Sequence, residues 1–184
     1  GSPFSVVAGT STSSTTSIDA GTHAITATYS GDADFAGSPT SIDQAVGAAA
    51  TTTTVSSSPD PSVFGQPVSV HAEVTPVSPA TGHPIGTIKF NVDDGANIIY
   101  VDLANGSADA TVTGLAVGDH TIKATYLSGD TNFVTSTSQP QTQTVNKAAT
   151  ETTVASSSPT SVFGQPVTFT ATVSPVAPCA GSPT

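Results

Sequence analysis

Two short acidic loops carry oxygen atoms that could bind a hard cation. The stretch SGDAD supplies Asp32 and Asp34, the stretch SGDTN supplies Asp130 and Asn132, and VDDG at 92–95 adds two carboxylates. Calcium takes about six to eight oxygen ligands in proteins, and neither an EF-hand spacing nor a further glutamate completes such a set. We therefore predict no metal and no cofactor. The loops are expected to close as Asx turns, with calcium bound by Asp32, Asp34, Asp130 and Asn132 as the alternative.

Two of the four histidines occupy equivalent places in the chain. His23 and His120 each follow an apolar residue, Ile18 or Leu115, by five positions, and each then enters a similar strand pattern. Sandwich domains often use an aromatic residue in such a corner, with a polar atom bonded to the backbone. We predict that both are packed corner histidines that bond to backbone groups and do not ligate a metal.

The other residue types that carry chemistry do not form a recurrent set. His71 and His83 correspond to Thr170 and Ser182 one repeat later, so no metal site is repeated with them. Serine is abundant, but no nucleophile elbow, no repeated Ser/His/Asp set and no glycine-rich phosphate loop is present. The sequence predicts a protein that is not an enzyme.

The elements that hold these residues belong to a long internal repeat. The heptapeptide SVFGQPV occurs at 62–68 and again at 161–167, inside a longer match of 52–84 with 151–183, and 21–35 matches 118–133. Such a period is far longer than a solenoid repeat and equals one small sandwich domain. We predict the second part of a repeat at 1–46, a complete repeat at 47–147 and the first part of another at 148–184.

Two arrangements fit these partial repeats. In the first, the sequence is a window on a longer tandem array, which is the arrangement we favour because arrays of such modules are common. In the second, half-domains of neighbouring molecules complete each other and form a filament. The stretch GTIKFNVDDGAN at 86–97 has no counterpart in either partial repeat, and this missing strand counts against the second arrangement.

Strict alternation of apolar and polar residues predicts strands inside each unit. In VSVHAEV at 68–74 the apolar residues fall on one face, and TIKFNV at 87–92 and HTIKATY at 120–126 follow the same rule. Turn residues separate these stretches at the spacing typical of sandwiches. We predict seven or eight strands per unit in an antiparallel Greek-key sandwich, with Val63 and Phe64 of the heptapeptide inserted into its core.

The composition favours an all-β fold, because Thr and Val fit a pleated sheet and are abundant, whereas strong helix formers such as Leu, Glu and Met are scarce or absent. It also excludes some partners. Charged residues make up 9% of the chain, and three basic residues face thirteen acidic ones for a net charge of -10. Binding to phosphate groups requires clustered Lys and Arg, so nucleic acid and anionic membranes are poor partners. No apolar run approaches the length of a membrane span.

The ordered combination of motifs resembles a known family. FGQPVTFTATVSP, GTIKFNVDDG and LAVGDHTIKATYLSGDTNF are similar to the bacterial immunoglobulin-like repeats that occur in tandem in large surface and secreted proteins. The antibody hallmarks, paired Cys and a core Trp, are absent, since Cys179 is the one cysteine. The resemblance implies tandem immunoglobulin-like sandwiches used as spacer, stalk or adhesin modules, with no catalytic residues.

These observations lead to one expected function and two alternatives. We expect a non-enzymatic stalk, spacer or fibre segment of an extracellular or cell-surface protein, whose partners are neighbouring repeats in the same or adjacent chains. One alternative is an adhesin that binds cell-surface glycans or proteins, for which Tyr100 and Phe4 are the aromatic residues not assigned to a core. The other alternative is the self-assembling filament subunit described above.

Overall fold

A complete two-sheet sandwich occupies the middle of the chain in the computed structural model, which describes residues 4–16, 18–179 and 181–183. One sheet has the order β3-β5-β8, and the other has the order β4-β11-β9-β6-β7, with β10 paired to β9. The strands of the first sheet are β3 (Thr51–Ser58), β5 (Val68–Pro76) and β8 (Ser107–Val112). Those of the second are β4 (Ser62–Val63), β6 (Gly86–Val92), β7 (Asn97–Asp102), β9 (Gly118–Ser128), β10 (Ser136–Thr137) and β11 (Gln141–Asn146).

The connections give the sandwich its Greek-key character. Between β3 and β6 the chain changes sheet at every connection, and it crosses again between β7 and β8 and between β8 and β9. The sheets are antiparallel except for β4, which pairs in parallel with β11 through Ser62↔Val145 and Val63↔Asn146. The predicted all-β immunoglobulin-like sandwich is confirmed: seven strands lie where the alternation predicted them, and β4 and β10 are two-residue additions.

The core of the sandwich is built from the alternating residues of its two sheets. All four apolar residues on the inner face of β5 are buried, and they face the buried residues of β6 and β9. The central members of this cluster are fully buried: Val68, Val70, Ala72, Ile88, Phe90, Val112, Ile122, Ala124 and Tyr126. The inward faces predicted for these three strands are therefore correct.

Tyr126 gives this core its one buried phenol. Its ring is fully buried, and its hydroxyl donates a hydrogen bond to the carbonyl oxygen of Ile85 at 2.6 Å. This bond joins the end of β9 to the residue that precedes β6. A buried hydroxyl without a partner would be costly, so the bond helps to fix how these two strands enter the sheet.

The repeated heptapeptide does not contribute its phenylalanine to the core, so that part of the prediction is wrong. Phe64 is 45% exposed and lies on the turn after β4, while Val63 is partly buried. Gly65 adopts a φ of +80°, which allows the tight turn that the sequence indicated. Phe64 instead faces the linker that follows the sandwich, because the turn directs it to the end of the domain.

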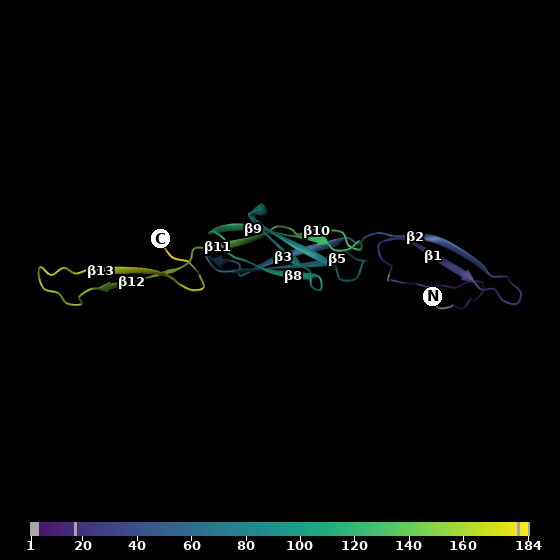
Figure 1. Cartoon of the computed structure of the whole chain (residues 1–184), viewed down its shortest axis with the longest axis horizontal. Helices are drawn as coiled ribbons and strands as arrows, with labels where there is room; N and C mark the ends of the chain where they lie inside the picture. Colours follow the sequence, from purple (N-terminus) through teal and green to yellow (C-terminus); the bar gives the residue numbers. More distant parts are fainter. Residues whose placement is uncertain (1–3, 17, 180, 184) are drawn as a thin grey trace.

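Two hairpins flank the sandwich along the chain (Figure 1). The first pairs β1 (Gly21–Tyr29) with β2 (Ser38–Val46), and the last pairs β12 (Thr150–Ser156) with β13 (Phe169–Pro175). The alternation is present in both, yet residues such as Ile25, Val154 and Phe169 are exposed. Figure 1 shows each hairpin as a single layer, so the buried face expected from the sequence has no second sheet to cover it in the described residues.

Within the described part of the chain, no helix has the length and apolar character needed to cross a bilayer.

The buried phenol of Tyr126 can be tested with a matched pair of variants. Tyr126→Phe should lower the free energy of unfolding by about 1–2 kcal/mol, because the Ile85 carbonyl loses its donor in a buried setting. Tyr100→Phe is the control, since Tyr100 lies 59% exposed on the edge strand β7 and should change stability little. Urea unfolding of both variants gives the comparison, and equal stabilities would contradict this role for the hydroxyl.

Candidate functional site

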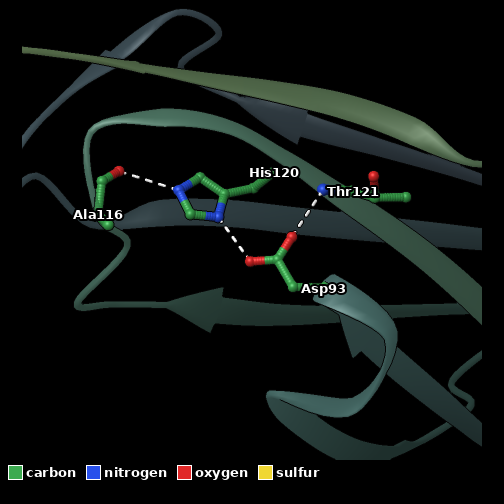
Figure 2. A network of polar contacts seen from close by, with 4 residues as sticks. All are labelled: Asp93, Ala116, His120 and Thr121. Carbon is green, nitrogen blue, oxygen red and sulfur yellow. Dashed lines mark hydrogen bonds and ion pairs between the residues drawn. The ribbon is translucent and has the colours of Figure 1, made fainter.

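A polar network at one corner of the sandwich involves His120 (Figure 2). The imidazole Nε2 lies 2.9 Å from the carbonyl oxygen of Ala116, and Nδ1 lies 2.6 Å from Oδ2 of Asp93. The other carboxylate oxygen of Asp93 accepts a hydrogen bond from the Thr121 N–H at 3.0 Å. Both ring nitrogens thus face acceptors, which the doubly protonated imidazolium satisfies best.

Asp93 reaches this corner because of the turn that ends β6. The short 3-10 turn η1 (Asp93–Gly95) begins directly after Val92, which pairs with Ile122 across the sheet. Asp93 and Asp94 both have positive φ angles, of 49° and 50°. The neighbouring Asp94 accepts a hydrogen bond from Lys123 Nζ at 3.0 Å. The turn is therefore held to β9 by two successive carboxylates.

The contacts shift the protonation equilibria of both partners. The hydrogen bond to Asp93, then the Ala116 carbonyl, raise the pKa of His120 above its ordinary value; burial opposes this, and the charges of Asp93 and Asp119 add to it. Burial pushes the pKa of Asp93 upward. The hydrogen bonds from His120 and the Thr121 N–H, with the attraction of the imidazolium, outweigh burial and leave that pKa below its ordinary value.

The equivalent histidine of the first hairpin makes the same backbone contact. His23 Nε2 lies 2.8 Å from the carbonyl oxygen of Asp19, the position that corresponds to Ala116. The prediction of corner histidines bonded to backbone is thus confirmed at both positions. The carboxylate partner of His120 was missed, although the antiparallel pairing of 87–92 with 120–126 would have placed Asp93 beside it.

The residues considered for calcium lie in two separate loops. In the first loop, Asp32 Oδ1 accepts from the backbone N–H groups of Asp34 and Phe35 at 2.9 and 2.8 Å, and Tyr29 donates to Oδ2 at 2.6 Å. These bonds, with the one from Tyr29 the strongest cause, hold the pKa of Asp32 below its ordinary value. This is the Asx-turn geometry that the sequence indicated.

The second loop repeats the turn and adds a longer contact. Asp130 Oδ1 accepts from the backbone N–H groups of Asn132 and Phe133 at 2.9 and 3.3 Å. The Asn132 side chain leaves the loop: its Oδ1 accepts from the Ala20 N–H at 2.7 Å, and its Nδ2 donates to Asp19 Oδ1 at 3.1 Å. Over the described residues, no group of three or more His, Cys, Asp or Glu side chains is arranged to hold a metal ion.

The Asn132 contact joins the segment before the first hairpin to the sandwich. The linker between them is tied to the same loop, because Ala49 donates to the Asn132 carbonyl at 2.7 Å and accepts from the Val134 N–H at 2.8 Å. The next linker residue, Ala50, accepts from the Val77 N–H at 2.9 Å. The sequence did not predict this contact, since Asn132 and Ala20 are 112 residues apart.

A groove marks the second junction, between the sandwich and the last hairpin. It encloses about 220 Å³ and is mostly apolar. Its lining residues include Phe64 and Val117 of the sandwich, Ala148 of the linker, and Pro175, Cys179 and Gly181. In this linker Ala149 accepts from the Val176 N–H at 2.9 Å, which repeats the Ala50 contact one unit later.

The His120 pair predicts a defined pH dependence of stability. His120→Gln should lower the free energy of unfolding by about 1 kcal/mol, a modest value because Asp93 is more than a third exposed. The full difference should appear between the ordinary pKa values of 3.8 for Asp93 and 6.5 for His120. It should shrink as pH rises through the raised pKa of His120, and also as pH falls through the lowered pKa of Asp93.

His71→Gln supplies the control for that experiment. His71 also pairs with a carboxylate, Asp109 at 2.8 Å, but both side chains are largely exposed, so its replacement should change stability little. Urea unfolding measured across the pH range separates the two variants. A His120→Gln effect that is independent of pH would contradict the charged pair.

The Asx turns predict how the chain responds to calcium. Calcium at millimolar concentration should produce no binding heat and no shift in unfolding temperature, because Asp32 and Asp130 each use one carboxylate oxygen to close their own loop. Calorimetry and thermal unfolding test this. Saturable heat that disappears in Asp130→Ala would contradict the prediction and support the calcium alternative.

Comparison with known proteins identifies the sandwich. Residues 52–146 match the family model described as bacterial Ig-like domain (group 3). No curated protein and no solved structure matches the chain. Domains of this family are typically non-catalytic and commonly belong to surface proteins. Since the match spans just over half of the chain and coincides with the two-sheet sandwich, the chain belongs to the bacterial Ig-like domain (group 3) family.

Proposed function

We propose that the chain is a structural segment of an extracellular or cell-surface repeat protein, in which consecutive immunoglobulin-like units form a stalk, spacer or fibre. In this proposal residues 1–46 are the second part of one unit, residues 47–147 are a complete unit and residues 148–184 are the first part of another. The main binding partners of each unit are its neighbouring units. Family membership supports a non-enzymatic structural or surface module, and the sequence repeat supports consecutive units.

The observation that carries the proposal is the way the linkers are held. Ala49 uses both its N–H and its carbonyl on the loop at 132–134, and Ala50 bonds to Val77. The second linker repeats the last contact with Ala149 and Val176. In a flexible linker the backbone N–H and carbonyl groups would be hydrogen-bonded to water. In these linkers they are bonded to the following unit, and the chain continues directly into the next strand. The linkers therefore act as part of the following unit and limit bending.

The direction of the strands supports an extended shape. Figure 1 shows the strands of the sandwich and both hairpins running close to the long axis of the chain. Strands of about seven to nine residues rise about 3.3 Å per residue, so with its turns each unit adds about 35–45 Å of length. A segment built in this way separates whatever lies at its two ends.

Electron microscopy of the protein isolated from its source, combined with its mass, tests the proposal. We expect a beaded rod whose contour length increases by about 35–45 Å for each unit that the mass allows. Compact particles would contradict it. Long regular fibres made from chains that end near residue 184 would overturn the tandem array in favour of the filament in which half-domains complete each other.

A binding screen separates the spacer from the adhesin alternative. Tyr100 and Phe4, the aromatic residues set apart for that alternative, are both 59% exposed. A spacer predicts no saturable binding of the chain to a glycan array or to host-cell proteins. Saturable binding that is lost in Tyr100→Ala and retained in His71→Gln would contradict the spacer and support the adhesin.

A further inference from the structure

We propose that each junction is closed by a two-part interlock, which rests on the proposed arrangement in consecutive units. In the first part, Asn132 of the following unit bonds the corner at 19–20 of the preceding unit. In the second part, Phe64 of the preceding unit packs against Cys179 and Gly181 of the following unit. Another unit of this kind is thus the partner that fits both ends of the sandwich.

The corner at 19–20 supplies one hydrogen-bond donor and one acceptor for the first part. His23 Nε2 lies 2.8 Å from the Asp19 carbonyl oxygen, and the Ala20 backbone N–H and the Asp19 side-chain carboxylate both contact Asn132. Asparagine suits this corner because its amide accepts from the N–H and donates to the carboxylate at the same time. An aspartate at 132 would place two carboxylates together and would repel Asp19.

The loop that carries Asn132 is fixed before it makes this contact. The Asp130 carboxylate caps the loop through the N–H groups of Asn132 and Phe133, and Ala49 donates to the Asn132 carbonyl. The side chain therefore projects from a backbone that is bonded on both sides. Contacts made by such ordered groups lose less conformational entropy than contacts made by a mobile loop.

The second part of the interlock appears at the other junction. Phe64 lines the groove with Cys179 and Gly181, and a Cβ built on Gly181 would lie 3.7 Å from the Phe64 ring. Phe163, the equivalent of Phe64 one repeat later, is fully exposed. Phe64 is covered both by Val117 of its own sandwich and by the segment around Gly181, whereas Phe163 has neither covering in the described residues.

The repeat places both parts on the same pair of surfaces. Val117 is the counterpart of Ala20, and it lines the groove together with Phe64, so the corner and the phenylalanine share one end of the sandwich. At the opposite end, a Cβ on Gly82 would lie 3.6 Å from the Phe133 ring, so the loops that contain 82 and 132 are neighbours. Gly82 is the counterpart of Gly181. Each junction thus displays one half of the interlock, and because Ala116 stands in place of Asp19, only the backbone N–H part of the asparagine contact has a counterpart at the Phe64 end.

Hydrogen exchange of the Ala20 amide in the complete 184-residue chain tests the first part. The amide should be protected in the natural sequence, and Asn132→Ala should accelerate its exchange about tenfold, as expected for the loss of one hydrogen bond. Thr131→Ala, at the exposed neighbouring position, should leave the exchange rate unchanged. An unprotected Ala20 amide, or equal rates in all three proteins, would overturn this contact.

The accessibility of the thiol of Cys179 tests the second part of the interlock, the packing of Phe64. Cys179 lines the same groove as Phe64, so Phe64→Ala should increase the rate at which a thiol reagent labels Cys179 several-fold. Phe163→Ala is the matched control and should not change that rate, since Phe163 is fully exposed. Phe64 lies outside the core cluster, so both variants are expected to fold. Equal labelling rates in the three proteins would overturn the packing of Phe64.

These results are separable from the test of the proposed function. A beaded rod in the micrographs together with an unprotected Ala20 amide would overturn the interlock. The chain would then be a spacer whose junctions are flexible. A protected amide and a Phe64-dependent thiol, together with specific glycan binding, would keep the interlock and overturn the passive spacer.

Discussion

The packing of the inner face of β5 against β6 and β9 is the interaction on which the rest of the structure depends. The core contains no disulfide and no tryptophan; it consists of small aliphatic residues with Phe90 and Tyr126. Such side chains stabilise a sandwich only when both sheets are present, because each buries little apolar surface alone. The flanking hairpins illustrate the same constraint, since they repeat the alternation while their apolar residues remain exposed.

The polar residues act where this core ends. Asp93 and Asp94 bind the turn η1 to β9, Asp130 closes the loop after β9, and His120 fixes the corner before it. These contacts use only a few charged side chains, and only 9% of the residues in the chain are charged. The corner that His23 fixes also receives the Asn132 contact from the sandwich, and Val117, beside the corner that His120 fixes, lines the groove next to the last hairpin.

Much of the fold could be predicted from local patterns, whereas the junction contacts could not. The alternation of apolar and polar residues predicted the inner faces of β5, β6 and β9. The Asp-x-Asp and Asp-x-Asn patterns of the two loops predicted the Asx turns. Phe64 was misplaced because an apolar residue at a strand end satisfies a core and a junction equally well in sequence. Asn132 was considered as a calcium ligand because an amide oxygen can bind a cation or accept a hydrogen bond from a backbone N–H, and the sequence does not distinguish the two. Only the folded chain brings it to Ala20.

The parallel pairing of β4 with β11 has a mechanical consequence. When the two ends of the chain are pulled apart, β3 and β4 are drawn toward the N-terminus and β11 toward the C-terminus, along the strand direction. The bonds between Ser62–Val63 and Val145–Asn146 then carry the force together in shear, and they cannot open one after another like a zipper. The resistance of the domain to pulling therefore depends on this short contact between its first and last strands, and the free energy of unfolding alone does not set it.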